Sequence, residues 1–292
     1  MKEERLGLIF GISAFCLWGF LVVFFKQFNG VNPYEIVAHR VLWSVLVLLL
    51  VLVYLKRISS LIKILLNFNV TFWLFISGLL LSSSWCIFVY AVDAGLVLEA
   101  GFGNFISPLL SILIGCFALK ENITNGAKVA VFFVVLAILI QSLTLGSLPV
   151  LSILLATIVA IYGLIKKKIR VAALEGLFVE NLLITPIAMT YFLYLLHSSQ
   201  SHFMADLNGF LLILCGPVTV VPLLLFSAAT TRINLSTMGY LQYINPSISI
   251  LLAIFLYGES VGIYKIISFC LIWVALAIIT LEGFYKYKKG HK

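Results

Sequence analysis

Long apolar runs separated by short polar breaks extend from Leu6 almost to the C-terminus. Each run holds about 20 residues, the length that an α-helix needs to cross a hydrocarbon core of roughly 30 Å. A membrane barrel would instead show segments of about ten residues with alternating polarity. The pattern therefore predicts an all-α integral membrane protein with ten transmembrane helices, over residues 6–26, 33–54, 70–91, 96–119, 124–143, 148–165, 174–196, 207–227, 236–257 and 261–284.

Composition and charge support this prediction. The chain is 63% hydrophobic and only 10% charged, whereas charged residues make up about a quarter of a soluble domain. Lys and Arg outnumber Asp and Glu by 19 to 11, and their positions explain the excess better than nucleic-acid binding does. If both termini are cytoplasmic, sixteen of the 19 basic residues fall on the cytoplasmic side, as the positive-inside rule requires. We therefore expect a multi-pass protein with both termini in the cytoplasm.

One stretch of the chain occurs twice. Residues 102–121 (FGNFISPLLSILIGCFALKE) are echoed by residues 240–259 (YLQYINPSISILLAIFLYGE), with proline and glutamate thirteen positions apart in both copies. The echo divides the chain into two repeats, residues 1–145 and 146–292, of five predicted helices each. Because five is odd, the second repeat must enter the membrane from the opposite side. Inverted repeats of this kind are typical of secondary transporters that work by alternating access.

The paired prolines and amides are the first candidate functional residues. Pro108 and Pro246 lie inside predicted helices, where proline removes a backbone hydrogen bond and bends the helix. We interpret them as matching hinges, with a static bend as the alternative. Asn104 and Gln242 lie one turn earlier and could line a substrate pathway or form hydrogen bonds between helices.

The second predicted helix contains the residues that are most costly to place in a bilayer. Glu35, His39 and Arg40 fall in its first two turns, and insertion scales assign an Arg at mid-bilayer a cost of about 2.5–3.5 kcal/mol. The seventh helix carries Glu180 and Asn181 at the matching place in the second repeat.

Two interpretations of Arg40 and Glu180 remain open. In the functional one, Arg40 binds an anionic or polar group of a substrate while Glu180 accepts a proton or a cationic group, and His39 and Asn181 belong to the same pathway. In the alternative, Arg40 extends to the outer headgroups and Glu180 is neutral and hydrogen-bonded between helices. A permanent ion pair between them is not expected, because their backbones should differ in depth by about 10 Å.

Other residues receive more modest roles. Trp18 and Tyr162 form another matched pair, each followed by glycine, that suits either helix packing or a cavity wall. Glu121 and Glu259 are interpreted as charges at helix N-termini. No metal-ligand spacing, nucleotide-binding loop or hydrolase motif occurs in the sequence, so we expect neither a metal, a cofactor nor enzymatic activity.

Three segments resemble the drug/metabolite transporter superfamily and, within its EamA group, the RarD-type chloramphenicol-sensitive permeases. They are EIVAHRVLWS at 35–44, WCIFVYAVDAG at 85–95 with LEA at 98–100, and LQYINP at 241–246 followed by FLYGE at 255–259. The resemblance covers the whole chain and implies ten transmembrane helices, two EamA repeats and transport across the bacterial inner membrane. Ser84, Asp93 and Asn104 depart from the pattern expected there, so the resemblance does not identify a substrate.

Together these features predict a secondary transporter that exports, rather than imports, small metabolites or drugs. The expected partners are a small-molecule substrate, protons as a candidate coupling ion, and membrane lipid, whereas nucleic acid is not expected. The protein could act as a monomer or a homodimer. A membrane-embedded enzyme and a structural or assembly protein are the alternatives; the first would need a catalytic cluster of titratable residues, and the second would not need paired hinges and intramembrane charges.

Overall fold

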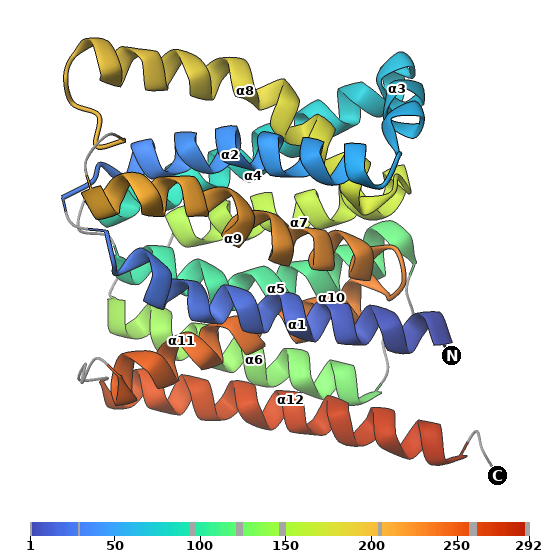
Figure 1. Ribbon diagram of the computed structural model, residues 1–292. Coiled ribbons are helices and arrows are strands. Elements are labelled where there is room, and N and C mark those ends of the chain that lie inside the picture. Colours follow the sequence, from blue (N-terminus) through green and yellow to red (C-terminus); the bar gives the residue numbers. More distant parts are fainter. Residues whose placement is uncertain are drawn as a thin grey trace.

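The computed structural model describes residues 2–28, 30–93, 97–120, 125–145, 150–203, 206–256 and 262–289. These residues form a bundle of roughly parallel and antiparallel helices, so the predicted all-α fold is confirmed (Figure 1). The helices of the first half are α1 (Lys2–Phe25), α2 (Pro33–Tyr54), α3 (Ile58–Leu66), α4 (Phe68–Asp93), α5 (Val97–Leu119) and α6 (Asn125–Leu145). Those of the second half are α7 (Val150–Ile169), α8 (Ala173–His197), α9 (Asp206–Thr230), α10 (Leu235–Leu241), α11 (Ile244–Phe255) and α12 (Ile263–Lys289).

Most predicted spans correspond to one helix each. Within the described residues, six helices are long and apolar enough to cross a membrane, namely α1, α2, α4, α7, α8 and α9. Shorter apolar segments occur in α5, α6 and α12. The ninth predicted span, 236–257, is broken instead into α10 and α11, and Gln242 and Tyr243 lie at the break.

A short helix, α3, was not predicted. It runs across one end of the bundle, nearly perpendicular to the long helices (Figure 1). Its residues Ile58, Leu61 and Ile64 pack against a core that includes Leu74 of α4 and Leu174 of α8. With nine residues, α3 is far too short to span a bilayer, and a search for spans overlooks such a segment.

Local sequence explains where α2 begins and several helices end. Asn32 caps α2 by accepting a hydrogen bond from the Tyr34 amide, and Pro33 occupies the first helical position. Lys56, Lys120 and Arg170 adopt left-handed backbone conformations, with φ of 55°, 54° and 52°, just after α2, α5 and α7. Their positive charges are also favourable at helix C-termini.

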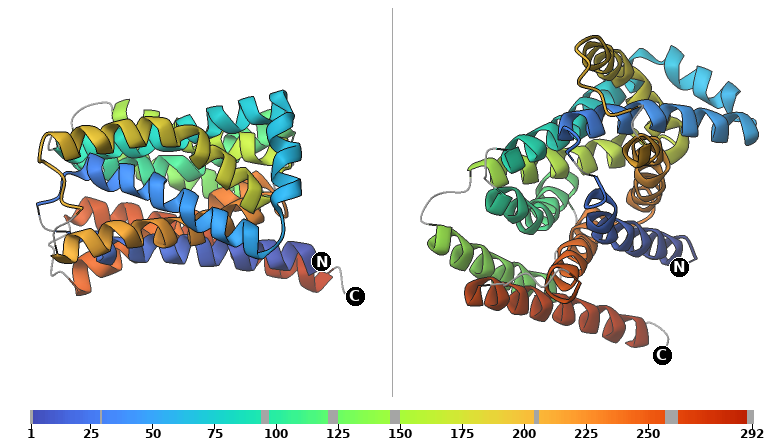
Figure 2. Two further views of the ribbon diagram at one scale, coloured as in Figure 1. Left: turned by 45° about the horizontal axis from the view of Figure 1, so that its top comes forward. Right: turned by 60° about the vertical axis from the view of Figure 1, so that its left-hand side comes forward.

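The most extensive helix contacts join the two halves of the chain. Helix α5 packs on α7 and α10, α2 packs on α8 and α9, and α6 packs on α12. Figure 2 shows α6 and α12 side by side at one edge of the bundle. The halves are therefore interleaved, and a cavity near the centre has walls from both.

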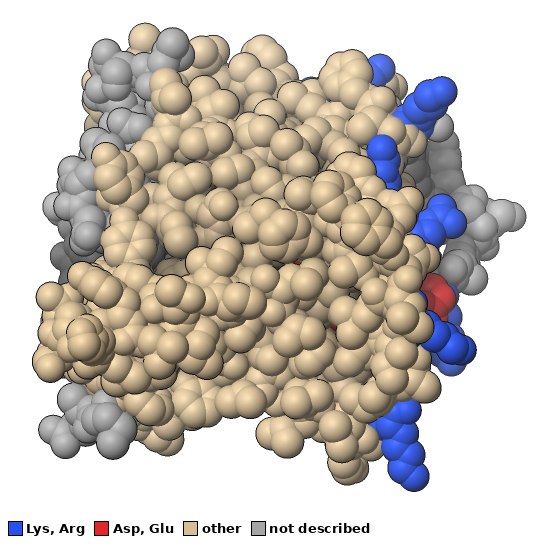
Figure 3. All heavy atoms as spheres, turned by 90° about the horizontal axis from the view of Figure 1, so that it is seen from above, with Lys and Arg blue, Asp and Glu red and all other residues tan. Residues whose placement is uncertain are grey.

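Basic residues gather at one end of the molecule. On the face shown in Figure 3, Lys and Arg side chains lie at the end where α1 begins and α12 ends. The rest of that face is almost entirely uncharged among the described residues. This polarity, together with the apolar helices, is what a multi-pass membrane protein requires.

Substitution of Gly216 tests the close approach of α2 and α9. A β-carbon at Gly216 would lie 2.6 Å from Cβ and 2.7 Å from the carbonyl carbon of Trp43. Gly216→Ala is expected to destabilise the protein by about 1–3 kcal/mol, because the two backbones must separate. Thermal unfolding of the purified protein measures this, with Gly262→Ala as the control, since a β-carbon there meets nothing within 4 Å. Equal stability of the two variants would contradict the packing.

Candidate functional site

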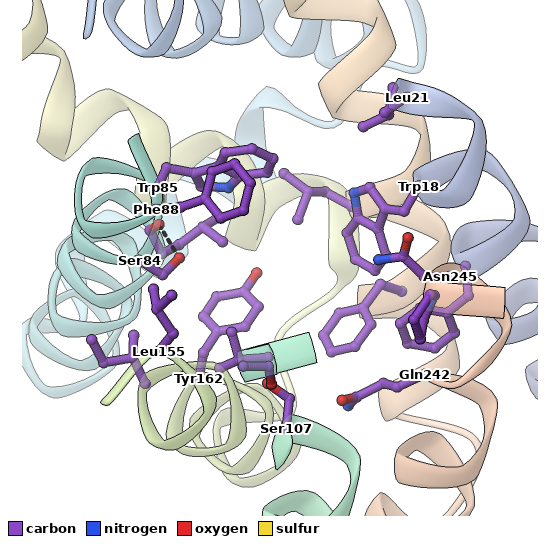
Figure 4. A pocket seen from close by; sticks show the side chains of 18 of the residues that line it. Trp18, Leu21, Ser84, Trp85, Phe88, Ser107, Leu155, Tyr162, Gln242 and Asn245 are labelled. Carbon is purple, nitrogen blue, oxygen red and sulfur yellow. Dashed lines mark hydrogen bonds between the residues drawn. The ribbon is translucent and has the colours of Figure 1, made fainter. Parts of the chain in front are cut away.

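A pocket of about 280 Å³ lies between the two halves of the chain. Figure 4 shows its lining side chains, which come from α1, α4 and α5 of the first half and from α7, α9, α11 and the α10–α11 break of the second. Its size is near the lower limit for small-molecule sites. The lining residues are Phe15, Trp18, Leu21, Phe25, Leu81, Ser84, Trp85, Phe88, Gly103, Ser107, Leu155, Ile158, Val159, Tyr162, Leu223, Phe226, Gln242, Asn245 and Pro246.

Trp18 and Tyr162, the matched aromatic pair, both line this pocket. Phe226 of α9 lies between them, with ring centroids 5.5 Å from Trp18 and 6.0 Å from Tyr162. Gly19, next to Trp18, allows α1 to approach α11, because a β-carbon there would lie 2.7 Å from Cβ of Ile248. Trp18 and Tyr162 therefore both pack against a neighbouring aromatic ring and form part of the pocket wall.

Gln242 and Pro246 reach the pocket because the ninth predicted span is broken. Gln242 lies at the break, lines the pocket and donates a hydrogen bond from Nε2 to Oγ of Ser111 at 3.1 Å. Pro246 follows in the first turn of α11, where a missing amide hydrogen costs little. The helix is therefore interrupted just before this proline.

Pro108 is surrounded differently from Pro246. It lies inside the continuous helix α5, and its carbonyl oxygen faces Gly239 of α10, where a β-carbon would approach to 2.7 Å. Its neighbour Ser107 lines the pocket. The side chain of Asn104, the other predicted amide, lies outside the described part of the structure.

Arg40 lies one layer behind the pocket. Its guanidinium carbon is 4.1 Å from the ring centroid of Trp85, which is itself part of the lining. The Arg40 side chain is buried and forms no hydrogen bond or ion pair with any other residue whose side chain is described. A cation–π contact offsets only part of the cost of burying a positive charge.

Glu180 is buried in a network of donors behind Tyr162. The Lys166 ammonium donates to Oε1 at 2.9 Å, and the Ser77 hydroxyl donates to the same oxygen. The Tyr162 phenol lies 3.5 Å from Oε2. Tyr162 connects the Glu180 network to the pocket, because its phenol approaches Glu180 and its side chain lines the cavity.

The position of Lys166 differs from the sequence prediction. We placed it in a cytoplasmic loop after a helix ending at residue 165, but α7 continues to Ile169 and the Lys166 side chain is only 5% exposed. A β-carbon at Gly176 of α8 would lie 3.2 Å from the Lys166 ammonium. This glycine therefore provides part of the space in which Lys166 reaches Glu180.

His39 and Asn181 do not line the pocket. The His39 ring lies between Phe203, at a centroid distance of 5.0 Å, and Phe192, at 4.7 Å, and its Nδ1 accepts a hydrogen bond from the Trp43 indole. Asn181 donates to the carbonyl of Leu177 in its own helix. Both residues stay close to the bundle core, away from the cavity.

Known proteins that are similar to this chain identify its family. The model of the EamA-like transporter family matches residues 5–143 and again residues 147–281. The chain belongs to the EamA-like transporter family. It is 37% identical to Protein RarD of Escherichia coli K12, over 100% of this chain and 99% of that protein. It is 33% identical to the uncharacterized transporter YojE of Bacillus subtilis, over 99% of this chain and 98% of that protein. A crystal structure with 17% identity and a TM-score of 0.73 covers 95% of this chain and 98% of its own.

These matches confirm the resemblance to RarD-type permeases and show a membrane transporter. The EamA-like model matches the chain twice, and residues from both matched stretches line the pocket. The likeness to the solved structure concerns the fold alone.

In this EamA-like chain, Glu35 holds the connection between α8 and α9. Its fully buried carboxylate accepts hydrogen bonds from the Ser201 hydroxyl at 2.7 Å, the His202 amide at 2.8 Å and His202 Nδ1 at 3.0 Å. Phe203, the next residue, stacks on His39. Its place in the first turn of α2 is typical of a helix-start charge, but its partners come from a loop more than 160 residues away.

Removal of the Glu35 carboxylate is expected to release this loop. In Glu35→Ala, the amides of residues 201–203 should exchange hydrogen at least about tenfold faster, because hydrogen bonds to a charged group contribute about 1.5–3 kcal/mol. Hydrogen–deuterium exchange with mass spectrometry measures the effect. Glu3→Ala is the control, since Glu3 pairs with Arg232 on the surface. Unchanged exchange at 201–203 would show that the loop is held by other contacts.

Several residues around the pocket were not predicted from the sequence. Ser77 and Phe226 carry no sequence signal that separates them from other serines and phenylalanines of apolar helices. Trp85 is of a residue type that usually anchors a helix at the membrane interface, yet here it separates Arg40 from the pocket. Glu121 and Glu259, interpreted as helix-end charges, lie outside the described residues.

Proposed function

We propose that this protein is a secondary transporter that exports small amphipathic metabolites or drugs across the bacterial inner membrane. The observation that carries the proposal is the pocket, whose walls come from both halves of an EamA-like chain. A site between two inverted halves can open to either side as the halves rock against each other. The basic end of the molecule faces the cytoplasm, in accordance with the positive-inside rule.

Arg40 and Glu180 have complementary roles in this proposal. Arg40 supplies positive charge behind Trp85, on the pocket side of the first half. Glu180 is the candidate proton site, and Lys166, Ser77 and Tyr162 hold its carboxylate. Because the Tyr162 phenol approaches Glu180 and its ring lines the pocket, a bound substrate can alter the Glu180 network. Changes in protonation and in substrate occupancy are thereby coupled.

Transport by the purified protein in liposomes tests this function. Vesicles are loaded with a mixture of metabolites, and mass spectrometry follows solute loss under proton gradients of either direction. We expect one class of solute to move, Arg40→Ala to reduce its rate at least about tenfold, and Glu180→Gln to abolish the dependence on the proton gradient. Arg232→Gln, at a surface pair, should transport normally.

The same experiment separates the alternatives. A membrane-embedded enzyme would convert a solute into a product, and a structural protein would move none. Transport at wild-type rates by both Arg40→Ala and Glu180→Gln would refute the assigned roles.

A further inference from the structure

The pocket is built for an aromatic molecule. Seven of its lining residues are aromatic: Phe15, Trp18, Phe25, Trp85, Phe88, Tyr162 and Phe226. Phe226 and Tyr162 are stacked at an interplanar angle of 18°, so their rings present flat faces. Aromatic rings attract one another in offset and edge-to-face arrangements beyond simple area burial. A cavity of about 280 Å³ accommodates one or two rings with a short substituent.

Seven of the 19 lining residues have side chains that can form hydrogen bonds: Trp18, Ser84, Trp85, Ser107, Tyr162, Gln242 and Asn245. Ser84 and Ser107 donate to carbonyls of their own helices, Leu81 at 2.7 Å and Gly103 at 2.9 Å. Gln242 donates to Ser111. A sugar or a peptide with many polar groups would lose more hydrogen bonds to water than these residues replace. The ligand is therefore mostly apolar.

The charge next to the pocket is positive. The Arg40 guanidinium lies over the Trp85 ring, with its carbon 4.1 Å from the ring centroid, and no carboxylate among the residues whose side chains the structure describes is paired with it. In a low-dielectric environment the interactions of such a charge are strong.

Two acids whose side chains the structure describes, Glu180 and Glu35, are occupied elsewhere. Glu180 is matched by Lys166 at 2.9 Å. Glu35, on the same helix as Arg40, is bound by Ser201 and His202 of the α8–α9 connection. Neither carboxylate neutralises Arg40. A buried charge of this kind in a membrane protein marks a functional site whose counter-ion is to be identified.

We infer that the substrate of this pocket is a small aromatic monoanion, such as an arene with a short carboxylate chain. Its ring lies among Trp18, Phe226 and Phe15, and its anionic group lies at the Trp85–Tyr162 wall, behind which Arg40 contacts Trp85. Figure 4 shows Trp18 and Trp85 on opposite sides of the cavity. The inference rests on the proposed transport function and specifies its substrate class. A cationic ligand would be repelled by Arg40. A second negative charge would gain little from Lys166, the other described cation next to the wall, because Lys166 is already paired with Glu180.

Binding to a matched set of probes tests the inference. The full-length protein in nanodiscs is titrated calorimetrically with 3-phenylpropionate, 3-phenylpropionamide, 3-phenylpropylammonium and 3-cyclohexylpropionate. We expect 3-phenylpropionate to bind at least tenfold more tightly than the amide and the cyclohexyl acid, and the ammonium to bind weakest. Arg40→Gln should remove the preference for the anion over the amide, whereas Arg40→Lys should keep part of it. Lys63→Gln, an exposed position on α3, should change nothing.

Each outcome decides the matter. Equal or tighter binding of the amide or the ammonium, no binding of the anion, or an unchanged preference in Arg40→Gln would overturn the inference. Thermal unfolding of each variant identifies loss of folding separately, and Arg40→Lys keeps the charge if Arg40→Gln does not fold. The proposed function fails independently: if 3-phenylpropionate binds as expected but no solute crosses liposome membranes, binding stands and transport does not. If neutral solutes cross at wild-type rates in Arg40→Gln, transport stands and the substrate class is wrong.

Discussion

Lys166→Met is expected to lower the free energy of unfolding by about 3–5 kcal/mol, because it leaves the buried Glu180 carboxylate without its cation. The ammonium lies 2.9 Å from Oε1, and both side chains are almost fully buried. Methionine fills a similar volume, so the loss is electrostatic rather than steric. Thermal and chemical unfolding of the protein in mixed micelles measures the change.

The double variant Lys166→Met/Glu180→Gln distinguishes an ion pair from simple packing. A neutral amide at position 180 keeps one oxygen that can accept a hydrogen bond from Ser77, and replacing both members of a buried pair is often nearly neutral. We therefore expect the double variant to be more stable than Lys166→Met. If the second substitution brings no recovery, Lys166 acts through contacts other than its charge.

Ser107→Phe is expected to abolish transport while the protein still folds. Ser107 lines the pocket from α5, and among the described residues its hydroxyl bonds only to the carbonyl of Gly103 in the same helix. A phenyl ring at this place occupies a large part of a cavity of about 280 Å³ and excludes a ligand. Liposome transport and ligand binding should both fall at least about tenfold.

Leu154→Phe is the matched control for this substitution. Leu154 lies on α7 beside the pocket-lining Leu155, but 47% of its side chain is exposed on the outside of the bundle. Normal transport is expected there. If Ser107→Phe transports at the wild-type rate, this pocket is not the route of the substrate.

The sequence predicts the helices well wherever an apolar run is long. The second run, 33–54, coincides with α2, because Asn32 and Pro33 define its start. The prediction of helices from apolar runs fails at α3 and at the ninth span, for different reasons. Helix α3 is held by packing of Leu61 and Ile64 against other helices, and the break at Gln242 precedes a proline inside an unbroken apolar run.

The site was predictable only in part. Charge inside predicted helices indicated Arg40 and Glu180 as candidates, and the repeat indicated Trp18 and Tyr162. Of these four residues, Trp18 and Tyr162 line the pocket. The actual partner of Glu180 was hidden, because Lys166 stands in a run of three lysines at a helix end, where solvent exposure is the usual state. Only tertiary structure shows which of the three turns inward.

Basic residues lie at opposite ends of α1 and α7, the first helices of the two halves. The first helix of the chain carries Lys2 and Arg5 at its start and no basic residue in its last turn, whereas α7 carries Lys166, Lys167 and Lys168 in its last turn. Opposite insertion of the two halves, as in the transporter that we propose, would require this reversal. Prolines, glycines and aromatic residues can then match between the halves while the charges at the helix ends do not, and Lys166, which turns inward to Glu180, is the member of its run with a second role.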